Sequence, residues 1–244
     1  MMAAYYALLS YFLTFIYTGF SLAPSSTRTL LFQGLLYIPI ILVLAAQTNS
    51  SLFTDKEQKP ISIKRYLLLL LSLQLVTVSF SAISKMIFGN EPVVNDFPYK
   101  PQNLLAFISI VLVAPVCEEI IFRGYILDKL SRSIKSMPSI LISATLFAFL
   151  HVSLKYAVAV LGMGIAIGYI YLRTRSLKLV ILLHAGCNLI GFALYQIRGA
   201  QYIGHTQQEG PIKIFATILI SAMFSYLSWI IIRRNTTFGD IEHY

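Results

Sequence analysis

The chain has 244 residues, of which 57% are hydrophobic and only 12% are charged, and its mean hydropathy is +0.74. A water-soluble domain needs more charged surface than this, so the composition excludes one and indicates a polytopic membrane protein. The formal net charge of +9 does not indicate a nucleic-acid partner, because basic residues of membrane proteins gather in the loops on the cytoplasmic side.

Apolar segments long enough to cross the bilayer follow one another along the chain. A spanning helix needs about 20 mostly apolar residues. The sequence offers eight such segments, at 3–23, 29–47, 66–88, 102–130, 138–153, 156–173, 177–197 and 211–232. We therefore expect an all-α, polytopic transmembrane bundle of about eight helices.

The distribution of Lys and Arg among the loops predicts the orientation of this bundle. With both termini in the cytoplasm, twelve basic residues lie on the cytoplasmic side: Lys56, Lys59, Lys64, Arg65, Lys129, Arg132, Lys135, Arg173, Arg175, Lys178, Arg233 and Arg234. Six lie on the opposite side: Arg28, Lys85, Lys100, Lys155, Arg198 and Lys213. This bias favours cytoplasmic termini.

Two adjacent carboxylates, Glu118 and Glu119, lie inside the fourth apolar segment. A carboxylate in the bilayer costs about 3 kcal/mol, so such a residue is a candidate functional group. Adjacent helical residues diverge by about 100°, so both carboxylates are not expected to face one pocket squarely. Arg123 follows Glu119 by four residues, the spacing of a helical ion pair. We expect Glu119 to pair with Arg123, which leaves Glu118 available as a general base.

Histidines on two further helices each share a helical face with a motif partner. Phe147 and His151 are four residues apart, as are His184 and Asn188. A rise of 1.5 Å per residue puts Glu118 and His151 about 18 to 20 Å from the cytoplasmic ends of their helices. His184 and Asn188 lie about 10 to 16 Å from theirs. The depths allow one shared site.

The chemistry of such a site favours amide hydrolysis. A carboxylate and an imidazole can polarise a water molecule for attack on a carbonyl carbon. His184 and Asn188 are donors of the type that stabilises the resulting oxyanion. In the sixth segment, by contrast, Gly164 and Gly168 have the spacing of small residues that let helices pack closely.

Three motifs therefore follow one another in the second half of the chain. They are EExxxR at Glu118, Glu119 and Arg123, FxxxH at Phe147 and His151, and HxxxN at His184 and Asn188. Together they resemble the CPBP family (Abi, or CAAX protease and bacteriocin-processing) of intramembrane endopeptidases, which is related to the CAAX prenyl proteases. The resemblance covers 102–196.

The resemblance implies a role for each motif. Glu118 and His151 would activate the water, while His184 and Asn188 would form the oxyanion site. Glu119 with Arg123 would support Glu118, and Phe147 is the remaining supporting residue of the motifs. The family is described as independent of metals, so neither a cofactor nor a metal ion is expected.

The resemblance also organises the chain into one structural domain with three parts. Residues 1–101 hold N-terminal helices, 102–197 hold the catalytic core, and 198–244 hold the last helix and a cytoplasmic tail. The expected partners are the lipid bilayer and a membrane-associated or lipidated peptide or protein substrate, and no nucleic acid. The expected location is a prokaryotic plasma membrane, and the oligomeric state stays open.

Other readings of the same residues differ in class. A non-proteolytic membrane regulator or bacteriocin-immunity protein could share the fold. A zinc metalloprotease could use the same Glu and His residues, although no HExxH motif is present. A proton-coupled transporter could bury them along a pathway, and a thiol mechanism through Cys117 or Cys187 is a weaker alternative.

Overall fold

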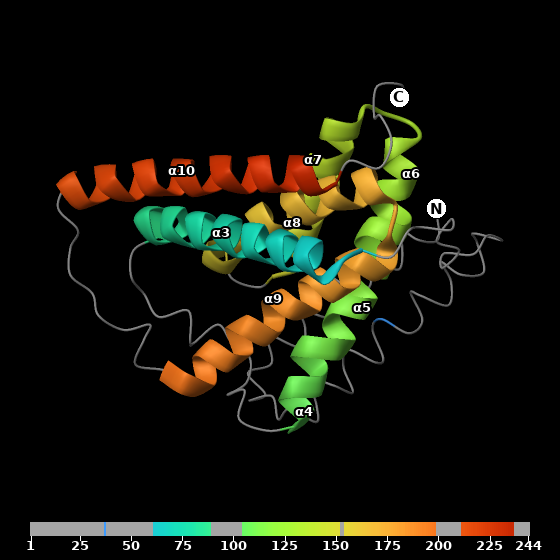
Figure 1. Ribbon diagram of the computed structural model, residues 1–244, viewed down its shortest axis with the longest axis horizontal. Coiled ribbons are helices and arrows are strands. Elements are labelled where there is room, and N and C mark those ends of the chain that lie inside the picture. The colour runs from blue at the N-terminus through green and yellow to red at the C-terminus, as the bar shows by residue number, and fades with distance from the viewer. Residues whose placement is uncertain (1–36, 38–60, 89–103, 152–153, 199–210, 237–244) are drawn as a thin grey trace.

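Helices form almost all of the protein that the computed structural model describes, namely residues 37, 61–88, 104–151, 154–198 and 211–236 (Figure 1). The described helical segments are six: α3 (Ile63–Phe88), a continuous segment from Leu104 to Ser131, α7 (Ser136–Phe149), α8 (Leu154–Thr174), α9 (Leu177–Arg198) and α10 (Pro211–Asn235). The predicted all-α class is confirmed. The predicted segments 3–23 and 29–47 lie outside the described residues except for Tyr37, so the number eight stays a prediction.

Four of these helices are long and apolar enough to cross a membrane by length and composition. They are Ile63–Phe88, Leu154–Thr174, Leu177–Leu194 and Phe215–Asn235. The chain is therefore a multi-pass integral membrane protein. α7 has only 14 residues, about 21 Å of helix against about 30 Å of hydrocarbon. It ends earlier than expected, so that His151 follows the C-terminal end of α7 rather than lying inside it.

The segment from Leu104 to Ser131 passes twice from α-helical into π-helical winding and back. It runs through α4 (Leu104–Phe107), the π-helical η2 (Ile108–Val113), α5 (Ala114–Glu119), the π-helical η3 (Ile120–Leu127) and α6 (Asp128–Ser131). π-Helical turns are rare and are frequent at functional sites. Here they flank the short helix that carries both glutamates.

α3 and α10 pack in antiparallel orientation through reciprocal serines (Figure 1). The Ser79 hydroxyl donates to the Ser221 carbonyl at 3.1 Å, and the Ser228 hydroxyl donates to the Ser72 carbonyl at 3.0 Å. The serines of each helix are seven residues apart, which places them on one face. Small hydroxyl side chains let the two helices approach and link them without an exposed polar group in lipid.

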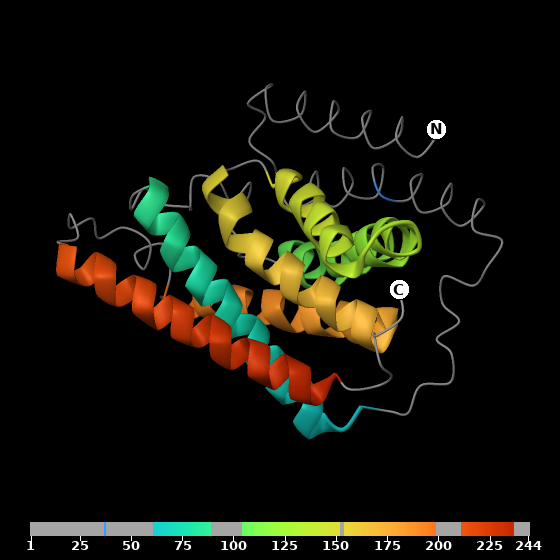
Figure 2. The same cartoon turned by 90° about the horizontal axis from the view of Figure 1, so that it is seen from above.

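α8 lies between α3 and α7 and uses its glycines on both sides (Figure 2). A Cβ added at Gly162 would lie 2.3 Å from the Phe80 ring of α3. One added at Gly164 would lie 3.2 Å from the Cβ of Ala144 in α7. The expected close packing at Gly164 is thus confirmed. It also brings the Gly164 carbonyl within hydrogen-bond distance of Arg123, on the segment that carries the glutamates.

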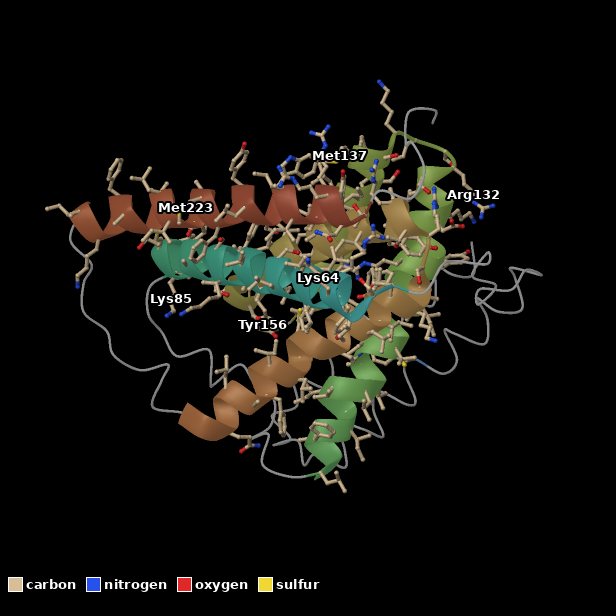
Figure 3. The ribbon with its side chains drawn as sticks, in the orientation of Figure 1. Lys64, Lys85, Arg132, Met137, Tyr156 and Met223 are labelled. Atoms are coloured by element: carbon tan, nitrogen blue, oxygen red, sulfur yellow. The ribbon has the colours of Figure 1, made fainter. Side chains whose placement is uncertain are left out.

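The fold gathers basic residues at one end of the bundle, where α3 and α9 begin and α8 and α10 end. Lys64 and Arg132 lie toward this end, and Lys85 lies at the other (Figure 3). The described residues of this end are Lys64, Arg65, Lys129, Arg132, Lys135, Arg173, Arg175, Lys178, Arg233 and Arg234. They belong to the set that the sequence places in the cytoplasm. The cytoplasmic assignment itself stays a prediction.

Candidate active site

A buried ion pair anchors the site on the segment that carries the glutamates. Glu119 is 0% exposed and Arg123 is 1% exposed, and Arg123 Nη1 lies 3.0 Å from Glu119 Oε1. Arg123 Nη2 also donates to the Gly164 carbonyl of α8 at 3.1 Å. The guanidinium carbon lies 4.8 Å from the centroid of the Phe147 ring. The predicted ion pair is confirmed, and it ties three helical segments together.

His184 contacts both glutamates. Its Nδ1 lies 2.8 Å from Glu119 Oε1, and its Nε2 lies 3.8 Å from Glu118 Oε2. Because a carboxylate accepts, Nδ1 donates to Glu119. The two carboxylates were not expected to face one pocket squarely, yet both contact the same imidazole. A single imidazole from α9 reaches both of them with nitrogens on different edges of its ring.

Glu118 has a different environment from Glu119. Its side chain is 13% exposed, so it is the more accessible of the two carboxylates. The hydroxyl of Tyr37, a buried residue, donates to Glu118 Oε1 at 3.2 Å. The sequence held no signal for Tyr37, because it precedes Glu118 by 81 residues and belongs to no motif.

His151 is held in one tautomer by the last turn of α7. Its Nδ1 lies 3.1 Å from the Phe147 carbonyl, which can only accept, so Nδ1 carries a proton. In the neutral imidazole the lone pair is then on Nε2. The ring also lies 5.2 Å from that of Tyr156 in α8, measured between centroids. His151 therefore has its Nε2 lone pair available as an acceptor, and its ring lies beside that of Tyr156.

Phe147 is the shared neighbour of the site. Its ring centroid lies 5.0 Å from that of His151 and 5.9 Å from that of His184. The Phe122 ring stacks edge-to-face on it at 5.4 Å. The ring thus contacts both histidines and covers the guanidinium of Arg123.

Asn188 follows His184 by one turn on α9 and fixes that helix. Its Nδ2 donates to the Ile110 carbonyl of η2 at 2.8 Å. One further N–H and the amide oxygen remain for other partners. Within the described part of the chain, no group of three or more His, Cys, Asp or Glu side chains is arranged to hold a metal ion. The site therefore offers acid–base and hydrogen-bonding groups.

Comparison with known proteins finds relatives of this region. Residues 100–190 match the family model described as Rce1-like, type II CAAX prenyl endopeptidase. The putative membrane peptidase YdiL of Bacillus subtilis (strain 168) is 32% identical over 84 residues, which are 34% of this chain and 34% of YdiL. The membrane-embedded CAAX protease MroQ of Staphylococcus aureus (strain USA300) is 26% identical over 176 residues, which are 62% of this chain and 70% of MroQ.

These matches cover only part of each relative. This chain matches about a third of the length of YdiL and about two thirds of the length of MroQ. No solved structure matches. The region matched by the family model contains all three motifs, from Glu118 to Asn188.

Proposed function

We propose that this chain is an intramembrane endopeptidase of the Rce1-like, type II CAAX prenyl endopeptidase family, because the model of that family matches residues 100–190, which hold all three motifs. Its substrate would be a membrane-associated or lipidated peptide or protein. The observation that carries the proposal is the contact of Glu118 and Glu119 with one imidazole, His184, inside an apolar bundle.

In the proposed reaction, Glu118 and His151 activate the attacking water. One of them takes a proton from the water as the water oxygen bonds to the carbonyl carbon of the scissile amide. Glu118 is suited to this because it is the more accessible carboxylate. His151 is suited because its Nδ1–H is occupied by the Phe147 carbonyl, which leaves Nε2 as the acceptor. The C–N bond then breaks as the leaving nitrogen receives the proton.

The negative oxygen of the tetrahedral intermediate needs donors. The second N–H of Asn188 and His184 Nε2–H are proposed for this role, and one such donor is worth about 3 to 4 kcal/mol. Because Nδ1–H of His184 is already donated to Glu119, Nε2 donates only when the ring is an imidazolium, so we propose that His184 acts in its protonated form. Glu119 is proposed to act on His184 as well as on Arg123. It receives Nδ1–H at 2.8 Å and thereby fixes which edge of the imidazole faces Glu118.

We propose that this chemistry needs no metal ion. Glu119 Oε1 already accepts hydrogen bonds from Arg123 and His184, and no group of three or more His, Cys, Asp or Glu side chains in the described residues is arranged to hold a metal ion. Activity is expected to survive treatment with a strong chelator. Loss of activity that added zinc restores would replace this proposal with a zinc hydrolase.

N-terminal labelling of membrane peptides tests the function as a whole. Cells would carry the wild type, Glu118→Gln, or the control Asp128→Asn, which alters an acid on the same helical segment in an exposed ion pair. New N-termini are expected with the wild type and the control but not with Glu118→Gln. Identical peptide sets for all three, with folded and inserted protein, would refute proteolysis and favour a membrane regulator or immunity protein of this fold.

A further inference from the structure

An aromatic pair joins α8 and α10 near the basic end of the bundle. The rings of Tyr169 and Trp229 lie 5.2 Å apart between centroids, and Trp229 is 44% exposed. α8 and α10 run in the same direction, and both end at the basic end (Figures 1 and 2). Four residues further along each helix, on the same faces, lie Arg173 and Arg233. Both arginines thus lie one turn beyond the aromatic pair, on the two helices that this pair joins.

These two arginines have no counter-charge in the part of the chain that the structure describes. Its acidic residues are Glu118, Glu119 and Asp128. Asp128, the acid of this end, is occupied by Arg132 at 2.6 Å and by Arg175 at 3.1 Å. Arg173 Nε is buried and has no hydrogen-bond partner within the described residues.

An anion between Arg173 and Arg233 would supply the missing counter-charge and a hydrogen-bond partner for Arg173 Nε. A phosphate offers several oxygens to the planar forks of two guanidiniums, which bind phosphate in bidentate fashion. It would also neutralise two positive charges on helices that the Tyr169–Trp229 contact holds together, close to the hydrocarbon, where charge is weakly screened. Lys64, at the start of α3, adds positive charge at the same end, and α3 packs against both α8 and α10.

The aromatic pair indicates where the anion lies. Tyr and Trp rings favour the level of the membrane–water interface. One further turn of helix, about 6 Å, reaches the level of the lipid phosphates. We propose that Arg173 and Arg233, above Tyr169 and Trp229, bind the phosphate group of an anionic phospholipid in the leaflet at the basic end.

Native mass spectrometry of the full-length protein tests this site. Protein in a neutral detergent would receive phosphatidylglycerol, phosphatidylcholine or inorganic phosphate. Wild type is expected to retain phosphatidylglycerol over phosphatidylcholine. Arg173→Gln/Arg233→Gln is expected to lower its retention by about tenfold or more, and Arg173→Lys/Arg233→Lys is expected to lower it less, because charge remains without the bidentate fork.

The control removes the same charge from the same end. Lys135→Gln/Lys178→Gln alters two exposed lysines and is expected to leave retention within about twofold of wild type. An equal loss in the lysine and arginine variants would overturn the proposal in favour of a diffuse field. Displacement of the lipid by equimolar inorganic phosphate would show a site for the free ion, and equal retention of the two lipids would overturn a site for an anionic lipid, because phosphatidylcholine also carries a phosphate. A melting curve for each variant confirms that it is folded, and the Lys variant keeps the test valid if the Gln variant does not fold.

Discussion

Removal of Arg123 is expected to destabilise the protein strongly. Arg123→Gln takes the ion-pair partner from Glu119, a carboxylate that is 0% exposed, whose Oε1 keeps only His184 Nδ1 and whose Oε2 has no hydrogen-bond partner within the described residues. Breaking a buried pair by removing one partner costs about 3 to 5 kcal/mol. The lost hydrogen bond to the Gly164 carbonyl contributes about 1 kcal/mol within that range. Unfolding in mixed micelles, followed by circular dichroism, would measure the change in the free energy of unfolding.

The same helical segment supplies a matched control. Asp128 and Arg132 are also an acid and an arginine four residues apart, but Arg132 is 76% exposed. Arg132→Gln is therefore expected to cost at most about 1 kcal/mol. Glu119→Gln/Arg123→Gln, which leaves no unpaired charge, is expected to recover about 1 to 3 kcal/mol relative to the sum of the single changes. Equal costs for Arg123→Gln and Arg132→Gln, or strict additivity in the double variant, would refute the reasoning.

Two further changes test the packing and the surroundings of Glu118. Gly162→Ala is expected to lower the free energy of unfolding by about 1 to 3 kcal/mol, because the added Cβ would lie 2.3 Å from the Phe80 ring. Gly191→Ala is the control: its added Cβ meets nothing within 4 Å, and it is expected to stabilise the protein by up to about 1 kcal/mol. A similar effect of both alanines on the melting curve would contradict the packing. Tyr37→Phe removes the hydroxyl that donates to Glu118 and is expected to lower kcat more than it raises KM. An unchanged kcat would show that this hydrogen bond has no part in the reaction.

The sequence predicted contacts within a helix better than contacts between helices. The Glu119–Arg123 pair follows from a four-residue spacing, which defines one face of any helix. The contact of His184 with both glutamates depends on the tilt and rotation of α9 against α5, and no local pattern encodes these. The same is true of Tyr37, which precedes Glu118 by 81 residues.

Other differences arise where local winding departs from the regular helix. Nothing in the apolar pattern distinguishes the π-helical η2 and η3 from ordinary helix, because their mostly apolar residues fit both windings. The predicted end of α7, at residue 153, lies beyond the observed end at Phe149. Hydrophobic residues continue through Leu150 without a Gly or Pro, so the sequence carries no stop signal there. His151 still meets Phe147, because the chain makes a further turn in which the His151 N–H donates to the Ala148 carbonyl at 3.0 Å.

The most direct test of the proposed mechanism is cleavage of a substrate by purified protein in proteoliposomes, with Glu118→Gln and Asp128→Asn compared to wild type. The substrate would be a peptide identified by the N-terminal labelling described above. We predict that Glu118→Gln lowers kcat by at least about 100-fold with an unchanged melting temperature, while Asp128→Asn cleaves at the wild-type rate. Cleavage by folded Glu118→Gln at a rate close to that of wild type would contradict the assignment of Glu118 as the base.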